Sequence, residues 1–554
     1  MTKGISTLPD MDEFNIHDEN LNNVIVINSP DELISFVLDI FDFGDNIESE
    51  EELEHNNSYR ILSSLLKKFA VLTIAIEKKY VDRVYRDSYY MHFSCKHGKY
   101  SRFCKRLFLF LGNVFDGETA KKFSELPIDQ LQKRFMGTIV IRPLKEGKIG
   151  RTLINPSYVI DERDVFLRCA KYSATICGKR LQINAFPFSM QDGETTTCAE
   201  ITILNLMDYF SRKYPEYRSI LPSEIAQIAE ENGYERNLPT RGLGYSVITK
   251  VFSEVGFSPR LYTMNLFSDT SQFKRVMHYY IESGLPVAVG VKVDEKTRHS
   301  IVCIGHGKIH YDKIGNKIYA VYDTVNDNYI WIVDSADLCS HYVIMDDGRS
   351  PYETCEWKYV LQSDKVSTKN MLEDYEPDNL MVPLYKRMFL EAQDAYDICT
   401  SALASSRVGI QRICPDLGQI DNPVIIRLFM CSSRNFKQRR IENFGTLNSE
   451  VRERYINVLL PRFIWVCEIY DKKSYCERKV IGEIVIDATA SPHDGIKSVL
   501  LFHYPKYILA CKRNMKELFG HDIELEKVSE WEPFAGYDHN LFTPEEIKMK
   551  EYQH

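Results

Sequence analysis

Long apolar segments and a leader peptide are both missing from the sequence. No apolar run approaches the roughly 20 residues that a transmembrane helix needs. The first residues, MTKGISTLPDMDEF, have neither the basic start nor the apolar stretch of a secretory signal. The 14 cysteines follow no repeating pattern, which favours free thiols in a reducing compartment over a disulfide framework. We therefore expect a cytoplasmic protein that does not cross a membrane.

An excess of basic residues is missing too. The chain carries 69 Lys and Arg against 78 Asp and Glu, a formal charge of −9, so it has no clear nucleic-acid signature. Gly137, Gly147 and Gly150 lack the lysine and the strand–loop–helix context of a phosphate-binding loop. These absences predict no nucleotide or other cofactor, and they leave the oligomeric state open.

The sequence does contain enough apolar material for several domains. At 554 residues the chain is too long for one core, because single hydrophobic cores stop growing near about 250 to 300 residues. We predict a multi-domain α+β protein with an N-terminal α+β region at residues 1–157 and a central domain at 158–363. A charged, proline-marked linker at 364–380 then leads to a C-terminal α+β domain at 381–554 that folds on its own.

Local patterns predict individual elements. Apolar positions recur at helical spacing from Ile61 to Val84 and predict one long helix, whereas FMGTIVIRPLKEGKIGRTLINP predicts a hairpin. In the central domain, helices are followed by five strand-like runs that we assign to one antiparallel sheet: GLPVAVGVKV, HSIVCIGHG, KIYAVYDT, YIWIVDS and HYVIMDDG.

One cysteine has the setting of a nucleophile. In SMQDGETTTCAEITILNLMDYF, three threonines can cap a helix and apolar residues recur behind Cys198, which places its sulfur in the first helical turn. There the helix dipole and the free N–H groups favour the reactive thiolate and can hold an oxyanion. Gln191 lies seven positions upstream, across an Asp-Gly turn, and can supply a second oxyanion donor.

A thiolate also needs an acid–base partner. His299 opens the strand HSIVCIG about a hundred residues downstream and can project from the sheet toward the helix start. A carboxylate at the end of a neighbouring strand should orient its ring. Asp323, Asp334 and Asp346 all qualify; we prefer Asp346, followed by Asp334, because the turn DGRSPY fixes the carboxylate beside a proline.

The order Gln, helix-start Cys, strand-opening His, strand-ending Asp resembles papain-like cysteine peptidases, especially the branch of the bacteriocin-leader peptidases. The resemblance covers about residues 158–359 and differs in the Ala199-Glu200 pair after the cysteine and in a glutamine-to-cysteine gap one residue longer than in papain. It implies a papain-like fold and a Cys-His-Asp thiol hydrolase that acts on a protein or peptide. The flanking regions are similar to uncharacterised bacterial proteins, which implies no activity for them.

Other readings of these residues remain open. The same triad can run transamidation or deamidation, and a papain-like scaffold can also serve a non-enzymatic interaction protein. His92, Cys95, His97 and Cys104 in HFSCKHGKYSRFC are zinc-type residues, but their spacing is loose, and a basic surface turn is the expectation we adopt. His306 and His310 are interpreted as turn residues. We therefore predict no metal site.

Overall fold

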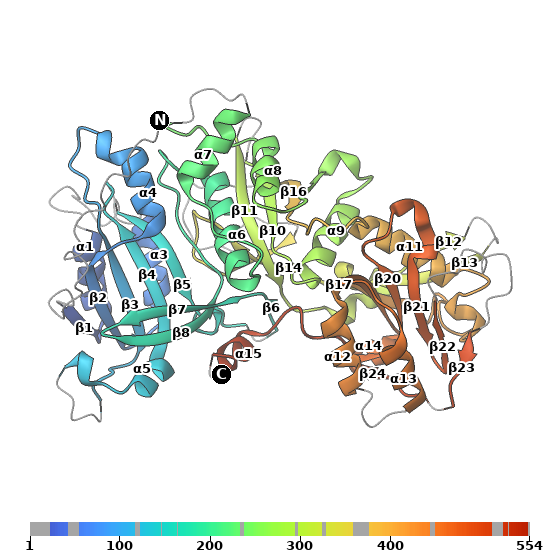
Figure 1. Ribbon diagram of the computed structural model, residues 1–554. Helices are drawn as coiled ribbons and strands as arrows, with labels where there is room; N and C mark the ends of the chain where they lie inside the picture. Colours follow the sequence, from blue (N-terminus) through green and yellow to red (C-terminus); the bar gives the residue numbers. More distant parts are fainter. Residues whose placement is uncertain are drawn as a thin grey trace.

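The computed structural model describes residues 23–41, 55–116, 122–145, 147–162, 164–232, 238–293, 297–323, 328–357, 376–443, 449–511, 525–529 and 531–551. It confirms an α+β protein with several sheets, and three large sheets follow one another along an elongated molecule (Figure 1). No described helix combines the length and the apolar character that a membrane span requires.

The N-terminal region is built on an antiparallel meander in the order β1-β2-β3-β4-β5. The strands are β1 (Asn23–Ile27), β2 (Leu72–Tyr80), β3 (Cys104–Leu111), β4 (Phe135–Arg142) and β5 (Lys148–Ile154). The β4–β5 pair is the predicted hairpin. The helices of this region are α1 (Pro30–Phe41), α3 (Asn57–Leu66), α4 (Arg83–Met91) and α5 (Ile128–Arg134).

The long helix expected from Ile61 to Val84 is wrong. Helix α3 ends at Leu66, and the second half of the segment is strand β2, whose first five residues are buried. Residues 72–80 form a strand and not a helix because they pair with two neighbours. Strand β1 lies along one edge of β2 and β3 along the other, so the backbone of this segment, which is rich in Ile and Thr, makes its hydrogen bonds within the sheet. Local apolar spacing does not contain that information.

The central sheet has the order β15-β14-β11-β10-β16-β9, and β6 adds to β11. The strands are β6 (Phe166–Leu167), β9 (Arg260–Thr263), β10 (Val287–Lys292), β11 (Arg298–His306), β14 (His341–Met345), β15 (Glu353–Glu356) and β16 (Glu376–Val382). The hairpin β7 (Ala170–Ile176) and β8 (Lys179–Ala185) precedes the helices α6 (Cys198–Lys213), α7 (Pro222–Glu231), α8 (Tyr245–Glu254) and α9 (Thr270–Glu282).

The linker assigned to residues 364–380 is partly a strand. Residues 358–375 lie outside the described part of the chain, but β16 begins at Glu376 and pairs with both β10 and β9 inside the central sheet. The polar composition of DYEPDNL is typical of a loop and gave no signal for a strand. The segment is a strand because it pairs with β9 and β10, which lie more than 80 residues upstream. The central sheet therefore closes beyond the boundary predicted at residue 363.

The third sheet takes strands from both sides of that boundary, in the order β12-β13-β17-β18-β20-β21-β22-β23. Strands β12 (Tyr319–Asp323) and β13 (Asn328–Asp334), expected in the central sheet, join it through the parallel pair β13–β17. The others are β17 (Val424–Ser432), β18 (Phe463–Tyr470), β20 (Gly482–Asp487), β21 (Val499–Tyr504), β22 (Tyr507–Ala510) and β23 (Glu526–Lys527). The sheet of the C-terminal region is therefore incomplete without residues 319–334.

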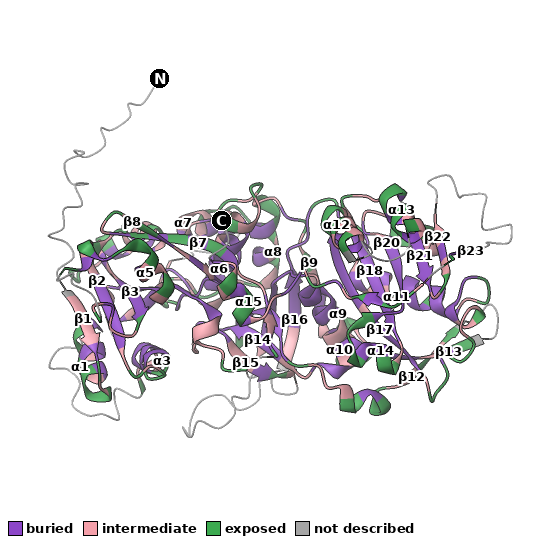
Figure 2. Ribbon diagram, turned by 90° about the horizontal axis from the view of Figure 1, so that it is seen from below, coloured by how far each residue is buried: buried purple, intermediate pink, exposed green. Residues whose placement is uncertain are grey.

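Helices and one small strand pair complete this region. They are α10 (Ser335–Leu338), α11 (Ala392–Ala404), α12 (Ser433–Asn443), α13 (Ser449–Asn457) and α14 (Lys472–Cys476), with the pair β19 (Lys479–Val480) and β24 (Phe534–Ala535). Figure 2 shows that the strands are largely buried while the outer faces of the helices are exposed.

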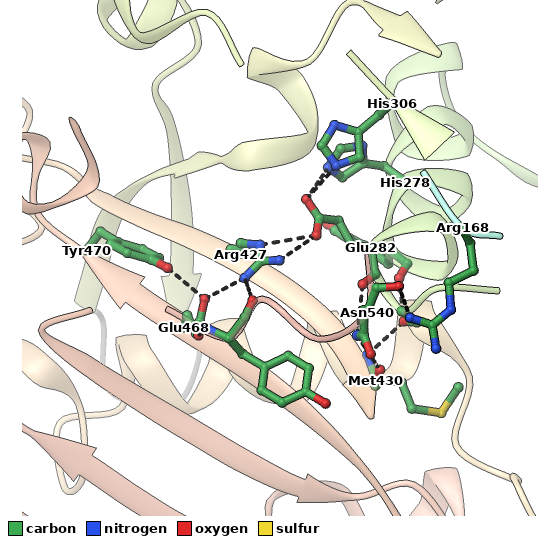
Figure 3. A network of polar contacts seen from close by, with 12 residues as sticks. Arg168, His278, Glu282, His306, Arg427, Met430, Glu468, Tyr470 and Asn540 are labelled. Carbon is green, nitrogen blue, oxygen red and sulfur yellow. Dashed lines mark hydrogen bonds and ion pairs between the residues drawn. The ribbon is translucent and has the colours of Figure 1, made fainter. Parts of the chain in front are cut away.

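A buried ionic network joins the central and third sheets (Figure 3). Glu282, at the end of α9, accepts hydrogen bonds from Arg427 of β17, and Arg427 also bonds Glu468 of β18 at 2.9 Å. Asn540 donates to the carbonyls of Glu282 and Met430. One continuous hydrophobic core contains residues of all three regions. The expectation that the C-terminal domain folds alone therefore conflicts with these shared contacts.

The chain end returns to the middle of the molecule (Figure 1). Helix α15 (Pro544–Met549) is followed by Glu551, whose carboxylate accepts hydrogen bonds from the Asn155 side chain and the Asn184 backbone. Arg168 donates to the carbonyls of His539 and Asn540. These contacts tie the last described residues to the hairpin that leads into α6.

Candidate active site

Cys198 is the first residue of α6, as its sequence setting predicts. The loop before it is organised by Asp192, one oxygen of which accepts from the N–H groups of Glu194, Thr195 and Thr196 at 2.7 to 2.9 Å. Its other oxygen accepts from the Thr195 hydroxyl. Gly193 has φ +76°, a conformation that favours glycine in this tight turn. The start of the helix is therefore held by a fixed loop.

Glu200 secures the first turn of α6. Its carboxylate accepts from the N–H of Thr197 at 3.0 Å and from the Thr197 hydroxyl, and its other oxygen accepts from Thr240 at 2.7 Å. The N–H of Cys198, as the first helical residue, has no partner within the helix. This leaves a backbone donor beside the thiol, and Cys198 is only partly buried.

His299 reaches the helix start from the second residue of β11. Strand β11 is paired on one side with β10 and on the other with β14, and the Ser300 hydroxyl bonds Thr202 of α6 at 3.0 Å. The ring contacts Asp346, the residue after β14, through Nε2 at 2.9 Å. The Asp346 contact engages Nε2 and not Nδ1, and the Cys198 thiol is one of the neighbouring groups that raise the pKa of the ring.

Asp346 is buried and well supported. Its Oδ1 also accepts from the N–H of Gly348 at 2.9 Å, and Arg349 Nε lies 3.3 Å from Oδ2. Burial by itself would raise the pKa of Asp346, but the charge and hydrogen bond of His299 and the Gly348 N–H outweigh it and lower the pKa. Asp346 therefore carries a negative charge beside the ring at neutral pH.

The environment of His299 favours the imidazolium form. Burial lowers its pKa, but the Asp346 carboxylate, the Cys198 thiol and Asp347 act in the opposite direction, so the pKa lies well above the ordinary 6.5. A charged imidazole next to a cysteine is the arrangement that stabilises a thiolate. The site therefore places a cationic ring beside the Cys198 side chain.

Asp347 adds a carboxylate that sequence reasoning missed. Its Oδ1 lies 3.5 Å from His299 Nε2. The His299 ring nitrogen and one carboxylate oxygen each of Asp346 and Asp347 all lie within 4.8 Å of one another. Because the Nε2 proton is already donated to Asp346, this nitrogen is occupied by a hydrogen bond. The signal available was the second Asp of the strand-ending pair in HYVIMDDG.

Gln191 lies in the same loop, and its side chain is exposed to solvent. Its backbone N–H lies near the Asp347 carboxylate. The oxyanion role expected for the side-chain amide stays a prediction.

The other two aspartates lie elsewhere. Asp334 is fully buried at the start of α10, where it accepts from the N–H of Ala336 at 2.8 Å and from the Tyr279 hydroxyl. Asp323 ends β12, in the third sheet. The structure thus brings Asp346, the first choice, to His299 and assigns Asp334 a capping position.

The N-terminal region contacts the loop in front of Cys198. His92 Nε2 lies 2.7 Å from a Glu194 oxygen, and Lys96 pairs with the same carboxylate. The Thr195 hydroxyl oxygen lies 2.9 Å from the hydroxyl oxygen of Ser88 in α4. His92 therefore pairs with an acid of the nucleophile loop; in the zinc-type group, Cys104 is buried in β3 and Cys95 is exposed. At least His92 and Lys96 of the predicted basic surface turn therefore make contacts within the protein.

The two downstream histidines differ from each other. His306 ends β11, is buried, and points Nε2 at Glu282 at 3.2 Å, so its assignment to a turn is wrong. His310 follows in the loop and contacts Ser340 at 3.0 Å. Neither residue contacts Cys198 or His299 by any described interaction.

Comparison with known proteins assigns no family to this chain. No family model matches it, and no curated protein is significantly similar to it.

Proposed function

We propose that this protein is a cytoplasmic thiol hydrolase that cleaves a peptide or isopeptide bond. The observation that supports the proposal best is the contact chain Cys198, His299, Asp346, with a helix-start thiol at one end and a 2.9 Å hydrogen bond to a buried carboxylate at the other. The three residues come from a helix, a strand and a strand terminus that are separately anchored. Their positions therefore do not depend on one flexible loop.

In the proposed reaction, the Cys198 thiolate attacks the carbonyl carbon while the backbone N–H of Cys198 and the Gln191 amide bind the oxyanion. The C–N bond then breaks, and the His299 Nδ1 proton goes to the leaving amine. Neutral His299 next takes a proton from water, whose oxygen attacks the thioester carbon; the C–S bond then breaks, which releases the carboxylic acid and restores the Cys198 thiolate beside the His299 imidazolium. Asp346 accepts a hydrogen bond from the Nε2–H group throughout, stays ionised, and keeps the ring oriented.

The same thioester can be resolved by an amine or formed from a side-chain amide, which would give transamidation or deamidation. The test is to incubate the protein with a peptide mixture and a primary amine and to identify products by mass spectrometry. New chain termini indicate hydrolysis, amine adducts transamidation, and a gain of one mass unit at glutamine deamidation. Cys198→Ala and His299→Ala should form no product. Identical product patterns for the wild type and Cys198→Ala would instead favour an interaction protein on this scaffold.

A further inference from the structure

Asp347 is a buried acid for which the described part of the structure provides no hydrogen-bond donor. The residue is 5% exposed, and neither carboxylate oxygen accepts a hydrogen bond from any described residue. The nearest backbone N–H groups, those of Gln191 and Asp347 itself, lower its pKa without reaching hydrogen-bond geometry. Because native proteins pair almost all buried polar atoms, an orphaned carboxylate beside an active site calls for a chemical explanation.

Orientation of the ring is not that explanation. Asp346 already accepts the Nε2 proton of His299 at 2.9 Å and is itself fixed by Gly348 and Arg349. Asp347 approaches the same nitrogen at 3.5 Å, which is too far for a second hydrogen bond but close for two charges.

The groups that face Asp347 come from three elements. They are His299 from β11, Asp346 from its own turn, and the main chain of Gln191 from the loop before α6. The nearby guanidinium of Arg349 is directed at Asp346 and at Glu353, 2.9 Å away. His299 is therefore the cation that the Asp347 charge acts on.

The consequence follows from charge. With a thiolate, an imidazolium and ionised Asp346, the site already carries one net negative charge, so Asp347 keeps its proton at low pH. Once Asp347 ionises, a second negative charge lies beside the imidazolium and opposes loss of the ring proton. The leaving amine needs that proton, so the proton is retained at a pH where a single carboxylate would not hold it.

We propose that Asp347 is a second acidic partner of His299, a positioning residue that keeps the imidazolium protonated as the pH rises and so extends activity to alkaline pH. This inference rests on the proposed thiol hydrolase function. It concerns a residue that the triad does not require for its geometry.

The experiment measures the rate at which the protein forms hydrolysis products from the peptide mixture between pH 5 and 10, by mass spectrometry, because expulsion of the leaving amine is the step that consumes the His299 proton. At pH 6 the rate of Asp347→Asn should lie within about twofold of the wild-type rate. The alkaline pH at which the rate begins to fall should be lower in this variant by at least about one pH unit, so that above this pH the variant is about tenfold slower than the wild type. Asp346→Asn should react more slowly at every pH. Asp312→Asn, whose side chain is 80% exposed, is the matched control.

Two outcomes would overturn the proposal: an unchanged upper limit in Asp347→Asn, or an equal loss at every pH, which indicates a merely structural role. Asp347→Ser provides a second neutral variant if the first does not fold. The His299 ring is also titrated by NMR in Cys198→Ala, with and without Asp347→Asn. Removing the acid should lower the His299 pKa there, whether or not the protein is a hydrolase. If the wild type forms no hydrolysis product, the proposed function fails, while this titration still tests the Asp347–His299 pairing.

Discussion

Replacing Asp347 by asparagine should make the protein's stability less sensitive to pH. The pKa of Asp347 is raised to about 7, because burial and the Asp346 charge raise it and the His299 charge and two backbone N–H groups offset only part of the rise. An acid whose pKa is raised by folding stabilises the folded state below its unfolded pKa, and this contribution is lost as the pH rises through the folded pKa. Asparagine has no such titration.

The magnitude follows from the two pKa values. The folded value of about 7 lies about three pH units above the ordinary 3.8, and each pH unit corresponds to about 1.4 kcal/mol, so the total is about 4 kcal/mol. About 3 kcal/mol of it falls between pH 5 and pH 8. Relative to the wild type, the variant should therefore gain about 3 kcal/mol between these two pH values.

The assay is urea unfolding followed by circular dichroism at pH 5 and pH 8 for the wild type, Asp347→Asn and the exposed control Asp312→Asn. An asparagine amide left without partners also costs free energy, but equally at both pH values, so the difference between them isolates the titration. A variant whose stability difference from the wild type is the same at pH 5 and pH 8 would refute the argument that Asp347 is an unpaired buried acid.

Three further predictions concern other parts of the molecule. Asp346→Ala should lower kcat/KM by about 10²- to 10³-fold and Asp346→Asn by less, because an amide oxygen still accepts the ring proton; loss of activity in Asp334→Ala alone would contradict the assignment. Arg440→Ala should lower the free energy of unfolding in urea by about 3 to 5 kcal/mol, because this fully buried arginine neutralises Glu468 and Glu483. A change near zero would contradict the view that the two buried carboxylates need the arginine. A fragment of residues 381–554 expressed alone should fail to give cooperative thermal unfolding, because its sheet lacks β12 and β13; a cooperative transition would restore the autonomous domain predicted from sequence.

Local signals were sufficient for the catalytic candidates. The threonines before Cys198, the apolar spacing behind it and the strand that begins near His299 are short-range features, and each element forms where these features place it. Among the three strand-ending aspartates, the turn DGRSPY after Asp346 favoured this residue, and Asp346 is the one that His299 hydrogen-bonds. The fold class was predictable for the same reason, since helical patterns in the central domain are followed by a run of strand patterns, the order that is typical of α+β proteins.

Sheet membership was not predictable in the same way. Strands β12 and β13 have the pattern of their neighbours, but the parallel pairing of β13 with β17 removes them to another sheet. Strand β16 is polar in sequence and central in space. Both outcomes depend on partners at a distance of about 80 residues or more, which local propensity does not encode. Asp347 was overlooked because the sequence argument sought one carboxylate, and only packing shows that two meet the ring.

The measurement that tests the central claim most directly is the order in which the cysteines are alkylated at mildly acidic pH. Cys198 is only partly buried, Cys95 and Cys476 are exposed, and Cys339 is buried. Burial would raise the pKa of Cys339, but His278 and His306 lower it to about 5, and the burial of this sulfur keeps reagents from reaching it. Limited iodoacetamide at pH 6 with peptide mapping should modify Cys198 at least about tenfold faster than Cys95 and Cys476, leave Cys339 unmodified, and lose this preference in His299→Ala. Equal labelling of Cys198, Cys95 and Cys476, or a preference that persists without His299, would contradict the assignment of Cys198 as an activated nucleophile.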